Sequence, residues 1–599
     1  MSDFRIQAIR LAALRTELKN RGIDGFLVPR ADEHQGEYVP PSAERLLWLT
    51  GFSGSAGLAA VLQERAALFV DGRYTLQAEQ QTDPRLYEHR HVSEAPLSAW
   101  LREHLRGGQL GYDPRLHTEN QVRRLAADCS RFGGSLVACP ANPLDAVWND
   151  RPEPPLGQID PHPLHFSGRP AEEKREEIAA RLAELGAGAT VLTQPDSIAW
   201  LLNVRGSDVP RTPLPLSFLI LHAKDGTGSI QWFVDERKLT DATRAQLDPA
   251  VTLRPPEALA EALGDLGGTA VLIDPNSAAA WFFDRLRHAG ANIIEGADPC
   301  ELPKACKNAV ELDGSRAAHR RDGAAVTSFL AWLDQAAPLG GITEMAAADK
   351  LTSFRSQREH FRDLSFDTIS GSGPNGAIVH YRVTPESDRE LQPGELYLVD
   401  SGGQYLDGTT DITRTIAIGA PSPEMRDRYT RVLKGHIALA RARFPQGTSG
   451  SQLDVLARRP LWEVGLDFDH GTGHGVGSYL SVHEGPQRIS KYPNAVALRP
   501  GMIISNKPGY YKNGAYGIRI ENLVAVVQSP AREGDERPML EFETLTLAPL
   551  DQRLIEPSLL TEAERNWVDS YHARVRETLS PLVDEGTATW LEAATKRLA

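Results

Sequence analysis

Two aspartates in the segment LYLVDSGGQYLDGTTDITRT, residues 396–415, have the residue type and spacing of a metal site. Asp400 ends an apolar run, and Asp411 begins a second run after a turn-forming stretch, so the pattern predicts a hairpin that brings both carboxylates together. Two neighbouring buried carboxylates repel each other unless a cation or a proton lies between them. The alternative is that both aspartates only form turns, since Asp side chains readily hydrogen-bond nearby backbone.

Histidines gather in the segment HGTGHGVGSYLSVHEGP, residues 470–486. His470 and His474 have the spacing of a helical zinc pair, but the interleaved glycines make a helix unfavourable there. We expect a glycine-lined loop in which His474 points at a metal and His483 points at substrate. A single histidine of this kind is more often a core residue, whereas three in one short loop indicate a site.

Glu521 and His380 are the remaining polar residues within apolar runs. Glu521, in GIRIEN, interrupts a buried strand pattern, and a buried glutamate requires a cation partner. The alternative is a pairing with Arg519, two positions earlier, or a place on an edge strand. His380 is predicted in the middle of the strand AIVHYRV, where an imidazole indicates a cavity.

The elements that must position these residues follow a repeated pattern. A helix through Ile9, Leu11, Leu14 and Leu18 precedes the strand IDGFLVP, and a helix through Ile178, Leu182 and Leu185 precedes the strand ATVLT. Both copies continue into a Leu- and Trp-rich segment followed by glycine, which predicts a duplicated α/β unit. The alternative is that this order is common to α/β proteins in general.

Clusters of proline and polar residues predict three domains, at residues 1–155, 156–306 and 307–599. The third opens with a long helical stretch and continues with strands separated by turns, which indicates an α+β fold after two α/β domains.

Composition excludes several classes of protein. The net charge of −14 does not favour nucleic-acid binding, which needs a concentrated basic face. No apolar run reaches the roughly 20 residues of a membrane helix, and the charged N-terminal segment does not resemble a signal peptide. The four scattered cysteines predict reduced thiols rather than a disulfide framework. We therefore expect a cytoplasmic protein without a membrane or nucleic-acid partner.

The motifs AIVHY, VDSGGQYLDGTTDITRT, HGTGHGVGSYLSVHEGP, KPGYY and GIRIEN, in this order, resemble those of aminopeptidase P, the Xaa-Pro aminopeptidases of the pita-bread metallopeptidase and creatinase superfamily. The resemblance extends over the whole chain and implies two creatinase-type N-terminal domains followed by a pita-bread catalytic domain with a C-terminal extension, as in the long, cytosolic three-domain form. It also implies a homodimer formed through the third domain.

The activity implied by this resemblance is hydrolysis of the bond between the N-terminal residue of a peptide and a proline at the second position, at two divalent ions, usually manganese. It implies metal-ligand roles for Asp400, Asp411, His474 and Glu521. It further implies that His380 and His483 handle substrate and protons, and that His470 is an additional substrate-binding histidine.

Lys507 departs from the pattern, because the family typically has a glutamate ligand immediately before PGYY. Asp400, Asp411 and Glu521 with a protonated Lys507 carry a net charge of about −2, which suits one divalent ion rather than two. By analogy with the family, the ion lost would be the one shared by His474, Asp411, Glu521 and position 507, which leaves Asp400, Asp411 and Glu521 around the other ion. Three hypotheses remain open: an active aminopeptidase P, an inactive peptide-binding relative, and a metal-free hydrolase similar to creatinase.

Overall fold

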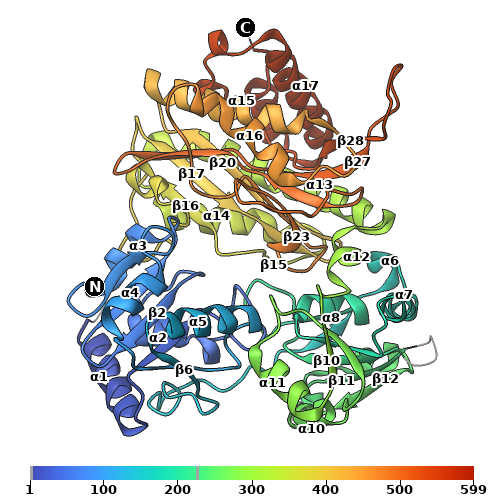
Figure 1. Cartoon of the computed structure of the whole chain (residues 1–599). Helices are drawn as coiled ribbons and strands as arrows, with labels where there is room; N and C mark the ends of the chain where they lie inside the picture. The colour runs from blue at the N-terminus through green and yellow to red at the C-terminus, as the bar shows by residue number, and fades with distance from the viewer. Residues whose placement is uncertain (1–3, 224–227, 599) are drawn as a thin grey trace. The chain divides into compact units, whose positions relative to one another are not determined.

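The computed structural model describes residues 4–223 and 228–598. Contacts between Cα atoms divide the chain into two compact units, the first comprising Met1–Leu164 and Arg169–Glu301 and the second comprising His165–Gly168 and Leu302–Ala599. Figure 1 shows the chain coloured from the N-terminus to the C-terminus. The predicted boundaries at 155 and 306 stay predictions.

The first unit contains two six-stranded sheets with the same topology. The first sheet has the order β4 (Glu88–His91), β3 (Ala66–Val70), β2 (Leu58–Leu62), β1 (Gly25–Pro29), β5 (Gln109–Tyr112), β6 (Ser135–Ala138). The second has the order β12 (Val251–Arg254), β11 (Ser229–Phe233), β10 (Phe218–His222), β8 (Ala189–Leu192), β13 (Ala270–Ile273), β14 (Asn292–Glu295).

Strand directions also agree between the two sheets. The central strand pairs antiparallel with its neighbour on one side and parallel with its neighbour on the other, in β1 and in β8 alike. The outer pairs, β3 with β4 and β11 with β12, are parallel in both sheets. This shared arrangement agrees with the predicted duplication of an α/β unit.

The predicted helices form, with small differences in their buried faces. In α1 (Phe4–Asn20) Leu11, Leu14 and Leu18 are buried, but Ile9 is 68% exposed and Gln7 is buried instead. In α7 (Ala171–Glu184) Ile178 and Leu182 are buried, whereas Leu185 follows the last helical residue and is exposed. Ile9 therefore lies outside the buried face of α1, and the prediction that the second helix includes Leu185 is wrong by one residue.

The second unit is an α+β structure whose long helix α13 (Ala309–Ala336) begins at a capping box formed by Asn308 and Glu311. One sheet has the order β16 (Ile369–Ser372), β17 (Leu396–Ser401), β20 (Ile412–Ala417). A larger sheet has the order β21 (Arg443–Pro445), β28 (Met539–Thr544), β27 (Asn522–Gln528), β24 (Ile503–Asn506), β22 (Gly473–Gly475), β23 (Glu484–Ile489).

Shorter strands and further helices complete the second unit. A small sheet has the order β15 (Phe361–Leu364), β18 (Gly403–Tyr405), β19 (Gly408–Thr409), and β25 (Gly509–Lys512) pairs with β26 (Tyr516–Arg519). The helices are α14 (Glu344–Ser356), α15 (Pro423–Ala440), α16 (Gly450–Trp462), α17 (Glu562–Leu579) and α18 (Glu585–Ala594).

Two predicted strands differ from the structure. The segment around His380 is not a strand, because the 3₁₀ helix Gly373–Ala377 follows β16 directly and His380 lies in the turn after it. The run GIRIENLVAVV is not continuous, since β26 ends at Arg519 and β27 begins at Asn522. Glu521 therefore lies at a break between two strands.

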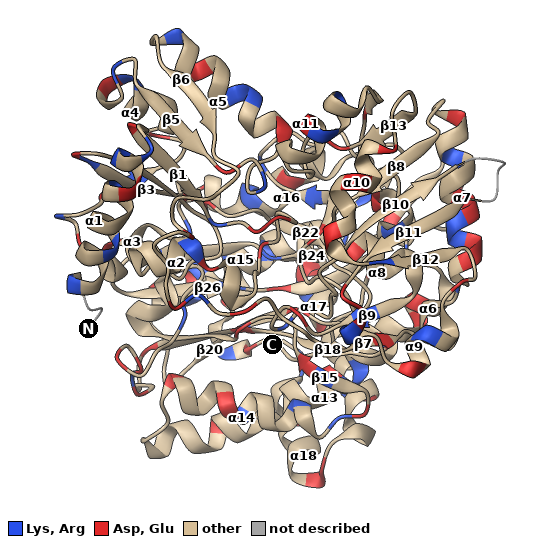
Figure 2. Ribbon diagram, turned by 90° about the horizontal axis from the view of Figure 1, so that it is seen from below, with Lys and Arg blue, Asp and Glu red and all other residues tan. Residues whose placement is uncertain are grey.

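Charged residues of both signs are interspersed along the helices of the first unit, as Figure 2 shows for α5 (Glu119–Arg131) and α7. Within the described ranges, the helices are all too short or too polar to cross a membrane.

Candidate metal centre

Asp400 and Asp411 lie beside each other at the end of the antiparallel pair β17 and β20. Asp400 is opposite Thr413 in the register of these strands, and Asp411 directly precedes β20. Both aspartates are buried. The two strands pair as the sequence predicts, although the connection between them also contains β18 and β19.

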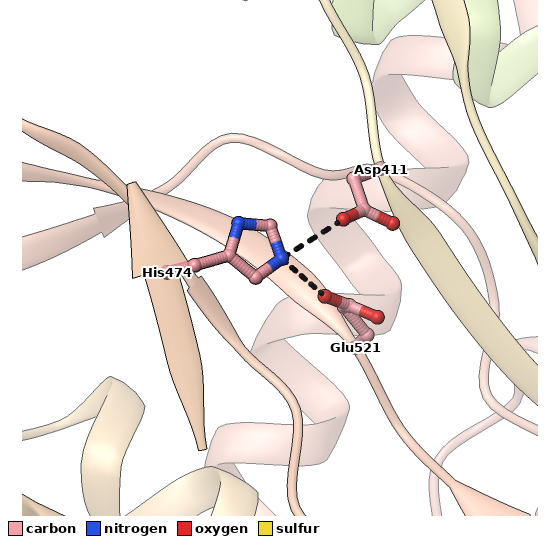
Figure 3. Close-up of side chains that lie close together, drawn as sticks. All are labelled: Asp411, His474 and Glu521. Atoms are coloured by element: carbon pink, nitrogen blue, oxygen red, sulfur yellow. Dashed lines mark ion pairs between the residues drawn. The ribbon is translucent and has the colours of Figure 1, made fainter. Parts of the chain in front are cut away.

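His474 and Glu521 approach Asp411 from the other sheet. His474 lies on β22, and Glu521 forms an isolated bridge with Thr413 at the start of β20. Nε2 of His474 is 3.4 Å from Oδ2 of Asp411 and 4.0 Å from Oε1 of Glu521. The three side chains converge on one point in Figure 3, and each offers a ligand atom within 4.8 Å of the others.

Buried atoms without hydrogen-bond partners indicate what this arrangement can hold. In the part of the chain that the structure describes, such atoms include Asp400 Oδ1, Asp411 Oδ1, His474 Nε2 and Glu521 Oε1. Buried polar atoms are normally satisfied, so each exception needs a physical explanation. All four belong to predicted metal ligands, and carboxylate oxygens with an imidazole nitrogen are ligands that divalent ions such as Mn²⁺ and Zn²⁺ accept. The residues therefore fit a divalent metal ion.

Electrostatic repulsion within the centre also favours a cation. Burial, followed by the neighbouring charges of Glu521 and Asp400, raises the pKa of Asp411 well above its usual value. Burial lowers the pKa of His474 well below its usual value, with Lys507 and His483 as the next causes. A neutral imidazole is the form that binds a metal.

Lys507 follows β24 and extends into this group. Its backbone N–H donates to the carbonyl of Thr472 at 2.7 Å, and its Nζ is 3.3 Å from Oε1 of Glu521. Burial acts to lower the pKa of Lys507, but the combined effect of Glu521, Asp411 and Asp400 is larger, so the pKa lies above its usual value. The side chain is therefore an ammonium beside one of the predicted ligand oxygens.

Arg519 connects the carboxylates to His470 through Tyr511. Arg519 Nη2 donates to Oδ2 of Asp400 at 2.7 Å, and Arg519 Nη1 donates to the Tyr511 hydroxyl at 2.6 Å. That hydroxyl is 2.8 Å from Nε2 of His470. The charge partner of Arg519 is thus Asp400, and the alternative pairing of Arg519 with Glu521 is wrong. The hydrogen-bond link from Arg519 to Glu521 runs through Thr413, which donates to Oε2 of Glu521 at 2.8 Å.

His483 and His380 lie next to His474. The rings of His474 and His483 are 4.2 Å apart and nearly perpendicular. His380, in the turn after the 3₁₀ helix, is close enough to contribute to the lowered pKa of His474. The structure thus brings the sequence-predicted histidines to the carboxylates, with His470 linked to them through Tyr511 and Arg519.

A further histidine, which was not predicted, contacts the residues next to Lys507 and Glu521. His436, on α15, has its Nδ1 3.1 Å from the carbonyl of Asn506 and its Nε2 3.2 Å from the amide of Asn522. Asn506 and Asn522 pair across β24 and β27 and immediately adjoin Lys507 and Glu521. The sequence signal for His436 is weak, since it is a lone histidine on a helix. Tyr511 was also missed, although it lies within the motif KPGYY.

Comparison with known families assigns most of the chain. Residues 313–528 match the model of metallopeptidase family M24, and residues 538–598 match the C-terminal region of that family. Residues 10–140 and 150–311 match two models of the creatinase/prolidase N-terminal domain. These matches confirm the predicted fold class, two creatinase-type domains followed by a pita-bread domain.

Individual relatives are similar over nearly the whole length. A probable Xaa-Pro aminopeptidase P of Coccidioides posadasii (strain C735) is 42% identical, covering 98% of this chain and 92% of the relative. Aminopeptidase P2 of Arabidopsis thaliana is 40% identical, covering 96% of this chain and 86% of the relative. The crystal structure of X-prolyl aminopeptidase from Caenorhabditis elegans, described as a cytosolic enzyme with a dinuclear active site, has a TM-score of 0.94 and 34% identity, covering 99% of this chain and 100% of that chain.

Proposed function

This chain belongs to the Xaa-Pro aminopeptidase P family, and from that premise we propose that it hydrolyses the bond between the N-terminal residue of a peptide and a proline at the second position. It is a metal-dependent aminopeptidase by family and by the chemistry of its site. The observation that carries the proposal is a set of four buried atoms without hydrogen-bond partners, on Asp400, Asp411, His474 and Glu521, among the described residues.

The ion that fits these ligands supplies, when bound, a Lewis acid and a water of lowered pKa. The chain's own residues supply the rest. His483 packs edge to face against His474, so its imidazole is held beside the metal ligands, where it is within reach of a substrate carbonyl or amide. We assign the same substrate-handling role to His380.

His470 is a substrate-binding residue in this proposal, and Tyr511 fixes its orientation. The Tyr511 hydroxyl bonds both His470 and Arg519, and Arg519 in turn holds one oxygen of Asp400. Burial, followed by the charge of Arg519, lowers the pKa of His470 well below its usual value. A neutral His470 adds no positive charge to the site, and its Nδ1, 2.9 Å from the carbonyl oxygen of Gly471, helps to hold the ring in place.

We propose that the centre holds one divalent ion, with manganese as the expected metal, and that Lys507 weakens its binding. Asp411, His474 and Glu521 are the ligand set we favour, in place of the set with Asp400 expected by analogy. The reason is that one oxygen of Asp400 is already paired with Arg519, whereas Nε2 of His474 faces both other carboxylates.

A second candidate is an inactive relative that binds proline-containing peptides. Lys507 is the observation that favours it, because its ammonium stands 3.3 Å from Glu521 where the family pattern has a further carboxylate ligand. A metal-free, creatinase-like hydrolase has less support, because burying carboxylate oxygens without hydrogen-bond partners costs free energy that only a bound cation would offset. From the resemblance alone we propose a homodimer. We also propose a cytoplasmic location, which the relative from Caenorhabditis elegans, described as a cytosolic enzyme, supports.

The test is release of the N-terminal residue from an Xaa-Pro-Pro peptide by the purified chain with Mn²⁺ in excess, beside an Xaa-Ala-Pro peptide. We expect cleavage of the first peptide and little cleavage of the second. Binding of the proline peptide without cleavage, measured by calorimetry at the same Mn²⁺ concentration, would support the inactive relative. Absence of both binding and cleavage would refute the aminopeptidase proposal.

A further inference from the structure

A buried carboxylate held between two lysines lies directly behind the histidine loop. Oε1 of Glu484 is 2.6 Å from Nζ of Lys307, and Oε2 of Glu484 is 2.9 Å from Nζ of Lys304. The three side chains are 0%, 1% and 2% exposed, in the order Glu484, Lys307, Lys304. Lys304 lies on α12 (Glu301–Ala305), and Lys307 precedes α13.

The segment that carries the two lysines is attached to the larger sheet of the second unit, which we call the catalytic unit. Lys307 donates its backbone N–H to the carbonyl of Gly501 at 2.9 Å, and its neighbour Cys306 forms a bridge with Met502, immediately before β24. Gly501 has a φ of +90°, and a Cβ there would lie 2.6 Å from the carbonyl oxygen of Lys307. The segment from Lys304 to Lys307 is therefore fastened to the larger sheet.

Glu484 is in close contact with the glycines that separate His474 from His483. A Cβ on Gly475 would lie 2.2 Å from the Glu484 carbonyl oxygen, and a Cβ on Gly477 would lie 2.9 Å from Oε2 of Glu484. Gly475 also pairs with Glu484 across β22 and β23. The backbone after His474 therefore rests directly on Glu484.

His483 immediately precedes Glu484, and its ring packs against that of His474 at 4.2 Å. One buried carboxylate thus contacts the chain next to both histidines. We propose that Glu484, clamped by Lys304 and Lys307, is a positioning residue that sets the relative placement of His474 and His483. This inference rests on the proposed function for its catalytic consequence, but its structural part can be tested separately.

The charges explain why the clamp is strong. A buried ion left without its partner is strongly destabilising, so Glu484 cannot leave the two ammonium groups without a large cost in free energy. Because Oε2 of Glu484 also lies against Gly477, displacement of the carboxylate would displace the loop. A clamp of this kind limits the loop to one conformation in which His483 faces His474.

The experiment compares Lys307→Met with Lys307→Arg and with a matched control, Lys238→Met. Lys238 has a similar buried ion pair, 2.8 Å from Asp208, and lies in the other unit. Amide hydrogen exchange of residues 473–484 is the primary measurement, since Gly477 N–H donates to Ser481 and Val476 N–H donates to Ile503 in this loop. Steady-state kinetics on the Xaa-Pro-Pro peptide are measured for each variant.

For Lys307→Met we expect exchange in residues 473–484 to rise at least about tenfold while exchange in α13 is unchanged. We expect kcat to fall about 10- to 100-fold, with a smaller change in KM, because a displaced His483 misaligns the reacting groups. Lys307→Arg should restore most of both values. Lys238→Met should affect neither, although it lowers the melting temperature.

Two results would overturn the inference: exchange in residues 473–484 that matches that of the native chain, or exchange that rises equally throughout the catalytic unit. If the native chain does not cleave the peptide, the proposed function fails, and the exchange experiment alone decides whether Glu484 positions the loop.

Discussion

The ammonium of Lys507 lies 3.3 Å from Oε1 of Glu521, so a fixed positive charge stands beside an oxygen that the centre offers to a metal. A cation already present reduces the attraction of the remaining carboxylates for a divalent ion. The metal content of this protein is therefore the property on which Lys507 has its most direct effect.

Replacing Lys507 by glutamate should raise both the number of ions bound and turnover. The substitution changes the charge of the site by −2 and adds a carboxylate ligand. We expect the Mn²⁺ content to rise from about one to about two per chain, measured by elemental analysis after dialysis, with a parallel gain in kcat.

Lys512→Glu is the matched control for that substitution. Lys512 is the last residue of β25, the strand that follows Lys507, but it is exposed and pairs with Glu424 at 2.7 Å. It should leave metal content and turnover unchanged. Equal metal content in the native chain and in Lys507→Glu would contradict the charge argument.

His474→Ala should weaken metal binding more than Asp400→Asn. His474 is part of the convergent group with Asp411 and Glu521, whereas Asp400 already has Arg519 as a charge partner. Mutation of a residue that only supports a metal ligand costs about 10- to 100-fold in affinity, so we expect at least that loss for the direct ligand in His474→Ala. Titration of the metal-free protein with Mn²⁺ measures it. A larger loss for Asp400→Asn would show that the ion is held by the other ligand set.

Tyr511→Phe should lower both kcat and stability. The hydroxyl links His470 to Arg519, so its removal frees the imidazole of His470 to reorient. It also leaves a buried donor of Arg519 without this bond, at a cost of about 1–3 kcal/mol of unfolding free energy. The control is Tyr516→Phe on the same hairpin, which removes a hydroxyl that donates to Glu424 of α15. If both variants lose kcat equally, the network through Tyr511 has no special role.

His436 should make the stability of the catalytic unit depend on pH. Burial, followed by the charge of Arg414, lowers the pKa of His436 from 6.5 to about 3. Below pH 6.5 the unfolded chain binds a proton at His436 that the folded chain does not bind. The free energy of unfolding therefore falls by about 1.4 kcal/mol per pH unit as the pH decreases from 6.5 toward 3, and this group has no such effect above pH 6.5.

The His436→Gln variant should therefore be less stable at pH 7.5 but lose less stability between pH 6.5 and 4.5. Urea unfolding followed by tryptophan fluorescence measures this, since Trp567 packs against His436 at 6.0 Å. The exposed His288→Gln should keep the native slope. Identical slopes for the native chain and His436→Gln would exclude the buried imidazole as the source.

Much of the fold follows from the sequence because its signals are local. The helix, glycine and strand pattern predicts both halves of the first unit, and the capping residues Asn308 and Glu311 mark the start of α13. The strand predicted around His380 does not form, because the Gly- and Pro-containing residues 373–377 are a 3₁₀ helix and His380 lies in the turn that follows. Local apolar content alone does not separate a strand from a turn packed against other elements.

The site was harder to predict because its contacts are distant in sequence. Asp400, Asp411, His474 and Glu521 were identified by residue type and by family resemblance, and the structure brings them together. The partner of Asp400, 119 residues away, is Arg519, which sequence analysis placed near Glu521. His436 and its two asparagines have no sequence pattern, since three separate elements meet there.

The proposed ligands come from two different sheets, which gives the ion a mechanical role as well as a chemical one. Asp411 precedes β20 of the three-stranded sheet, whereas His474 lies on β22 of the six-stranded sheet. An ion held by both is a cross-link between the two sheets. Any mutation that shifts one sheet against the other, however far from the centre, should therefore lower the affinity for metal before it lowers the stability of either sheet.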